Sequence, residues 1–111
     1  ESLAALQETV AQTFMIDGVV SYLVDLISAT RNHGDILRGA SPRATLSVTA
    51  MAKAVARLRG RDYVIPGDVK EVFTHTVAHR LILSPKAEAQ GLTPEQILRG
   101  ILDRVPAPKL R

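Results

Sequence analysis

The chain has 111 residues, of which 46% are hydrophobic and 23% are charged, and its formal net charge is +3. This length and composition indicate one globular domain and exclude both a disordered segment and a second domain. The absence of cysteine excludes disulfides and thiolate metal sites and fits a reducing setting, so we expect a cytoplasmic protein. The apolar runs are too short for a membrane span, and the scattered basic residues argue against a nucleic-acid partner.

Two amphipathic helices are predicted in the first third of the chain. Residues 2–12 carry apolar side chains at steps of three and four, which is the spacing of one helical face. Residues 16–31 show the same spacing more strongly, and Gly34 and Gly39 interrupt the chain after them. The expected buried residues are Leu3, Leu6, Val10 and Phe14 in the first helix, and Val20, Leu23, Val24 and Ile27 in the second.

A third helix is predicted from Ser41 to Arg59, with Ser41 as its N-cap and Gly60 as its stop. Residues 61–65 are expected to be extended. A fourth helix then opens at a proline, and its first turn carries Asp68, where the helix dipole favours an acid. The expected buried residues are Val48, Met51, Ala52, Val55 and Leu58 in the third helix, and Val69, Val72, Phe73 and Val77 in the fourth.

The last third of the chain predicts a brief strand and a fifth helix. Residues 80–83 are apolar and precede a Ser-Pro pair, which favours a short strand whose one plausible partner is 61–65. Thr93 and Gln96 have the spacing of a capping box, so a helix begins there. Its expected buried residues are Ile97, Leu98, Ile101 and Leu102.

These elements predict an all-α fold, a small bundle of about five helices with room for one short two-stranded ribbon. Aromatic residues are few, so alanine and leucine must fill the core, and both favour helices. The bundle is expected to span residues 1–105. Residues 106–111, PAPKLR, cannot continue the last helix because of their prolines and are expected to form a tail.

The start of the third helix carries two cations in an unfavourable place. Pro42 takes the first helical position and Arg43 the second, where the positive end of the helix dipole disfavours a cation by about 0.3–1 kcal/mol. Arg38 adds a second positive charge nearby. Free backbone N–H groups, small residues and arginines would suit a phosphate, which predicts an anion site of Arg38, Ser41, Pro42 and Arg43. The alternative is an exposed arginine held by a distant carboxylate.

Five segments of the sequence resemble, in order and at similar spacing, the C-terminal lid domain of MoxR-type AAA+ ATPases. The similarity covers nearly the whole chain, and the second and third segments together are its most specific part. The segments are ATR (29–31), GASPRA (39–44), GRDYVIPGDV (60–69), AHRLILSP (78–85) and VPAP (105–108).

This resemblance implies a role for Arg43. In that family the arginine of GASPR is the second-sensor arginine. It reaches from the lid to the phosphates of ATP, which is bound together with Mg²⁺ on the core domain. By the resemblance, Arg43 takes this catalytic role and the anion site contacts the nucleotide. The family also implies partners: an N-terminal AAA+ core domain of the same chain, neighbouring subunits of a ring, and a client protein for chaperone-like remodelling.

The sequence lacks the parts of a complete ATPase. A phosphate-binding loop ends in Gly-Lys, a pair that does not occur in the chain, and no apolar strand ends in Asp-Glu to hold magnesium. The chain is therefore expected to be a lid from a larger protein, inactive alone and without tightly bound ATP. Ile65 stands where relatives tend to have a capping threonine, so the fourth helix is expected to depend on Asp68 alone at its start and to be prone to fraying there.

Two other functions remain open from the sequence. A stand-alone helical adaptor would use Arg43 as an interface hot spot. A helix-turn-helix DNA-binding protein would use the cluster of Arg57, Arg59 and Arg61, although this cluster has no interleaved aromatic residues and suits the solvated end of a helix.

Several polar residues outside the anion site have structural interpretations. His75 and His79 share a helical face at zinc-ligand spacing, but no third ligand is evident and Thr76 stands where a metalloprotease needs Glu, so no metal site is expected. His79 and Arg80 match the family's His-Arg pair and are expected to pack near the ribbon, with a contact from Arg80 to nucleotide or a neighbouring subunit as the alternative. Arg31 suits the end of the second helix, and a packing or interface role is its alternative.

Overall fold

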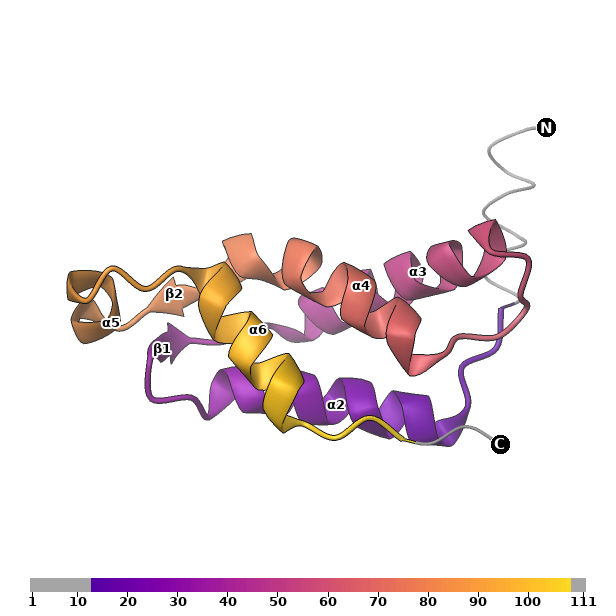
Figure 1. Ribbon diagram of the computed structural model, residues 1–111, viewed down its shortest axis with the longest axis horizontal. Coiled ribbons are helices and arrows are strands. Elements are labelled where there is room, and N and C mark those ends of the chain that lie inside the picture. The colour runs from indigo at the N-terminus through magenta and orange to yellow at the C-terminus, as the bar shows by residue number, and fades with distance from the viewer. Residues whose placement is uncertain (1–12, 109–111) are drawn as a thin grey trace.

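The computed structural model describes residues 13–108, so the helix predicted over 2–12 lies outside the described residues, whereas Phe14, which was expected to be buried, is 65% exposed. Within the described part the fold is helical with one short antiparallel ribbon, as predicted. Helices α3 and α4 lie side by side, α2 runs along the other side of the bundle, and α6 crosses between them (Figure 1). The elements are α2 (Asp17–Arg31), β1 (Ile36–Arg38), α3 (Pro42–Leu58), α4 (Pro66–Val77), the 3-10 turn η1 (Ala78–Arg80), β2 (Ile82–Leu83), α5 (Pro85–Ala89) and α6 (Pro94–Arg104).

The ribbon pairs different segments from those predicted. Strand β2 covers the last two residues of the predicted strand 80–83, but its partner is β1, with Ile36 opposite Leu83, and not residues 61–65. Segment 61–65 instead forms an isolated parallel bridge between Tyr63 and Phe14. Strand β1 has only three residues, which is too short for an alternating apolar pattern to reveal it. Its position depends on the burial of Ile36 in the core, which is a matter of tertiary packing.

The buried face of α2 is rotated from the predicted one. Leu23 and Ile27 are buried as expected, whereas Val20 and Val24 are 40% and 49% exposed. The apolar surface of α2 runs most of the way round the helix, so the sequence pattern did not decide which side meets the core. The residues that are buried are Val19, Tyr22, Leu23, Leu26, Ile27 and Thr30.

Helix α3 buries small residues where larger ones were predicted. Val48 and Ala52 are buried as expected and Val55 is half-buried, but Met51 is 50% exposed and Leu58 is 83% exposed. The buried stripe of α3 advances in steps of four and is mostly alanine, which lets α3 pack closely along α4. That stripe is Ala44, Val48, Ala52 and Ala56.

The later helices bury the faces that the sequence predicted. In α4 the four expected residues are all buried, and in α6 three are buried while Leu102 is partly buried against the core. The capping box of Thr93 and Gln96 is present in both directions, with N···O distances of 3.2 and 3.0 Å. Within the described chain, no helix combines the length and apolar character needed to cross a membrane.

Glycine ends two of the helices. Gly60 has φ of +78°, and the bonds from its N–H to Arg57 O and from Arg61 N–H to Ala56 O close the end of α3. Gly91 has the same φ at the end of α5, a helix that the sequence analysis missed. Ser84 caps the start of α5, so the Ser-Pro start and glycine stop were both present as signals.

Replacing two glycines by alanine is expected to change stability in opposite directions. Gly60→Ala should lower the free energy of unfolding by about 1–2 kcal/mol, because alanine resists the left-handed conformation. Gly100→Ala should raise it by about 0.5–1 kcal/mol, because Gly100 lies inside α6 and an added methyl would meet no atom within 4 Å. Urea unfolding of both variants tests this, and equal shifts would contradict it.

Candidate functional site

Arg43 lies on an open helix start, as predicted. Ser41 caps α3 by accepting a hydrogen bond from Ala44 N–H at 3.3 Å, and Pro42 follows at the first position. The first turn of α3 contains no acidic residue, and the Arg43 side chain is exposed. Within residues 13–108 no carboxylate pairs with Arg43 and no hydrogen bond satisfies its guanidinium. The distant-carboxylate alternative is therefore not seen in the described part of the chain.

The other cation, Arg38, lies in the ribbon. It is the last residue of β1, opposite Ile82 of β2, and its side chain is exposed. The ribbon therefore fixes the backbone of Arg38 three residues before the N-cap Ser41. Among the described contacts none joins Arg38 to Arg43 or to a carboxylate.

The segment between Arg38 and the helix start is held by the end of α2. Thr30 Oγ1 accepts a hydrogen bond from Ala40 N–H at 3.0 Å, and Arg31 Nε donates to Ala40 O at 2.8 Å. These contacts give Arg31 the packing role that the sequence left open as its alternative, and they give Thr30 a role that the sequence analysis missed. The bonds join residues nine and ten positions apart, so helix periodicity alone gave no signal for them.

A shallow hollow of about 410 Å³ lies between α2 and the start of α3. Pro42 is the one predicted site residue among its lining, and Arg43 is not part of it. Its walls are largely apolar, with exposed Val24 and Leu46 at the rim. The site therefore combines an apolar hollow with a neighbouring cationic helix start.

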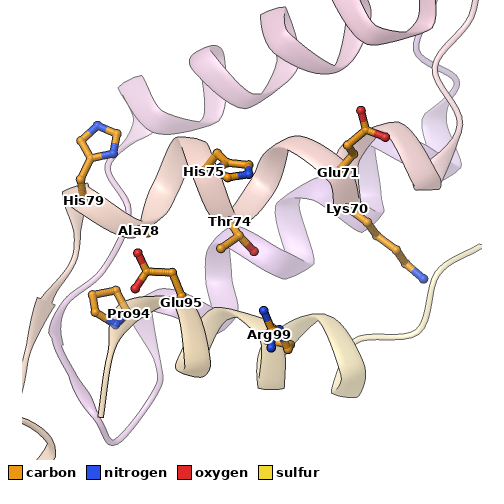
Figure 2. Close-up of a pocket in the computed structure, with 9 residues that line it drawn as sticks. All are labelled: Lys70, Glu71, Thr74, His75, Ala78, His79, Pro94, Glu95 and Arg99. Carbon is orange, nitrogen blue, oxygen red and sulfur yellow. The ribbon is translucent and has the colours of Figure 1, made fainter. Parts of the chain in front are cut away.

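A second hollow, of about 510 Å³, lies between α4 and α6 and carries charges of both signs (Figure 2). His75 lies on α4 and His79 on the following turn η1, and Figure 2 shows the His79 side chain directed away from Arg99 of α6. Within the described residues there is no group of three His, Cys, Asp or Glu side chains able to hold a metal ion. The full lining is Lys70, Glu71, Thr74, His75, Ala78, His79, Pro94, Glu95 and Arg99.

The cluster of Arg57, Arg59 and Arg61 is engaged with groups of its own chain. Arg61 binds the fully buried carboxylate of Asp68 through two bonds, of 2.6 and 2.8 Å. Arg59 pairs with Glu71, and Arg57 Nε donates to Thr13 Oγ1 at 2.8 Å. The sequence analysis placed these three arginines at a solvated helix end. Of the three, only Arg59 has a largely exposed side chain.

Asp68 is the electrostatic centre of this cluster. It also accepts a hydrogen bond from Ile65 N–H at 3.0 Å, so it caps α4 as predicted. Burial alone would raise the pKa of the Asp68 carboxyl, but the hydrogen bonds from Arg61 and Ile65 and the charges of Arg61 and Arg59 outweigh burial and lower it. Asp68 is therefore a carboxylate at neutral pH and joins the end of α3 to the start of α4.

A family comparison decides what this helical domain is. The sequence model of the AAA lid domain family matches residues 28–101, which include β1, α3 and α4 with the whole Arg43 region. The chain is an AAA lid domain. The lid is 35% identical over its full length to the uncharacterized protein YeaC of Bacillus subtilis, and covers 35% of that protein. It is 38% identical to the chaperone MoxR1 of Mycobacterium tuberculosis, over 97% of the lid and 31% of MoxR1.

A solved structure shares the fold of the lid. The crystal structure of an ATPase candidate from Cytophaga hutchinsonii superposes with a TM-score of 0.86 at 35% identity, over 92% of the lid and 34% of that chain. Together with the MoxR relatives, this confirms the predicted MoxR type of the lid. The lid spans about a third of the length of the relatives named here.

Proposed function

We propose that this lid closes over ATP and Mg²⁺ bound on an N-terminal core domain of the same protein, and that Arg43 is the second-sensor arginine. One observation carries the proposal: an exposed guanidinium without a described partner occupies the second position of α3, a helix start with no acid. The lid belongs to a family in which a nucleotide-binding core is implied. A nucleotide on that core would supply the missing negative charge.

Phosphate chemistry explains why the cation is tolerated at this position. The first turn of a helix offers free backbone N–H groups and the positive end of the dipole, both of which attract a phosphate. Arginine can bind two phosphate oxygens with parallel bonds, and the small side chain of Ser41 lets a phosphate approach the backbone. Arg38, fixed at the end of β1, adds a second positive charge on the approach to α3.

For the whole protein we propose a chaperone-like activity, by analogy with the relative MoxR1, which is named a chaperone. We place it in rings of AAA+ subunits in the cytoplasm, where closure and rotation of the lid would couple ATP hydrolysis to remodelling of a client protein. The lid alone is not expected to hydrolyse ATP, because its sequence has no Gly-Lys phosphate loop.

The direct test is ATP turnover by the full-length protein with Arg43→Ala. A matched control is Lys86→Ala, which removes an exposed cation from the first turn of α5. The proposal expects turnover to collapse in the first variant and to persist in the second. Wild-type turnover by Arg43→Ala would contradict it.

A further inference from the structure

Buried Thr30, in the last turn of α2, holds the segment that leads into α3. Its hydroxyl donates to Ile27 O at 2.6 Å and accepts from Ala40 N–H at 3.0 Å. Both Thr30 and Ala40 are shielded from water, so no solvent molecule replaces this bond when it is lost. One side chain therefore fixes the distance between the end of α2 and the residue before the N-cap of α3.

Arg31 completes the attachment from the exposed side. Its Nε donates to Ala40 O at 2.8 Å, so neighbouring residues of α2 bind both polar groups of Ala40. Gly39 brings the two backbones into direct contact, because a Cβ on it would lie 2.5 Å from Thr30 O and 2.8 Å from Arg31 Cα. No other residue fits at position 39 without moving the backbone.

We infer that Thr30 and Arg31 are positioning residues for Arg43, an inference that rests on the proposed function. Ala40 precedes the N-cap Ser41 directly, and Arg43 follows two residues later on a rigid helix. Helix α3 packs chiefly along α4, and the two bonds to Ala40 are the described hydrogen bonds that join α2 to the segment leading into α3. They set where the Arg43 guanidinium stands when the lid closes over the phosphates.

If Thr30 and Arg31 position Arg43, changing either residue should lower ATP turnover only while Arg43 is present. A displacement of 1 Å in a group that contacts the reacting centre lowers the rate by up to about 10²-fold. Thr30→Val, which keeps the shape but removes the hydroxyl, and Arg31→Met, which keeps the stem but removes the donor, should each lower kcat about 10- to 100-fold. Thr30→Ser keeps the hydroxyl and should restore kcat to near the wild-type value.

The test is a double-mutant cycle with Arg43→Ala in the full-length protein, read as kcat and KM for ATP. If Thr30 and Arg31 act through Arg43, adding either change to Arg43→Ala should alter kcat by less than about twofold. Equal losses in both backgrounds would show a merely structural role and overturn the inference. Because Arg31 is exposed, Arg31→Met carries the test if Thr30→Val does not fold.

The same cycle separates this inference from the proposed function. The positioning role would be overturned, and the role of Arg43 left intact, if Arg43→Ala is slow while Thr30→Val and Arg31→Met keep wild-type turnover. Wild-type turnover by Arg43→Ala would overturn both. Thermal melting of each variant confirms that the rates are compared between folded proteins.

Discussion

Under the proposed function, Arg43→Ala in the full-length protein is expected to lower kcat for ATP by about 10³–10⁵-fold, the range for removing an arginine that stabilises a transferring phosphoryl group. The reason is the exposed position of the guanidinium at the start of α3, where no described carboxylate competes with a phosphate for it. Steady-state hydrolysis measures the change, with Lys86→Ala as the matched control. The kcat of Arg43→Lys should lie between those of Arg43→Ala and the control Lys86→Ala, because lysine keeps the charge but loses the paired bonds.

The same substitution should make the lid more stable. Removing a cation from the first turn relieves about 0.3–1 kcal/mol of unfavourable interaction with the helix dipole. Alanine also has the higher helix propensity. Urea unfolding of the 111-residue chain tests this. A loss of stability in parallel with the loss of activity would mean that Arg43 serves the fold and not a nucleotide.

The sequence placed correctly the helix ends that carry chemical signals, with those of α5 as the exception. The Ser41 cap with Pro42, the stop at Gly60, the acid at Asp68 and the capping box at Thr93 are all present where they were expected. Each signal acts within four residues, so local sequence is enough to place it. The short α5 carries the same signals and was missed, because its five residues show no apolar period of their own.

Features that depend on distant parts of the chain were not predictable in this way. The partner of β2 and the buried side of α2 are set by how the helices pack, and alternatives with the same local pattern exist. The candidate site divides along the same line. The exposed start of α3 at Arg43 follows from local sequence, whereas the bonds of Thr30 and Arg31 to Ala40 appear only in the folded chain.

The pairing of Asp68 with Arg61 is likewise tertiary, and its loss should have the largest effect on stability. Asp68→Asn is expected to lower the free energy of unfolding by about 3–5 kcal/mol, the range for breaking a buried ion pair by removing one partner. Asp68 is fully buried, and its replacement leaves the Arg61 side chain, which is 19% exposed, without a counter-charge. Asp25→Asn is the matched control, because Asp25 is exposed on α2 and has no described side-chain partner.

The same carboxylate should make the domain sensitive to acid. The folded pKa of Asp68 is lowered, so in acid the unfolded chain binds a proton more readily than the folded one, and stability rises with pH there. The contribution of Asp68 is therefore complete above the unfolded pKa, about 3.9. It is lost as the pH falls from that value through the lower folded pKa. Urea unfolding across this range should show a steep loss of stability in the wild type and in Asp25→Asn, and a flatter profile in Asp68→Asn. Parallel profiles for all three proteins would contradict the role of Asp68, because the acid sensitivity would then come from other groups.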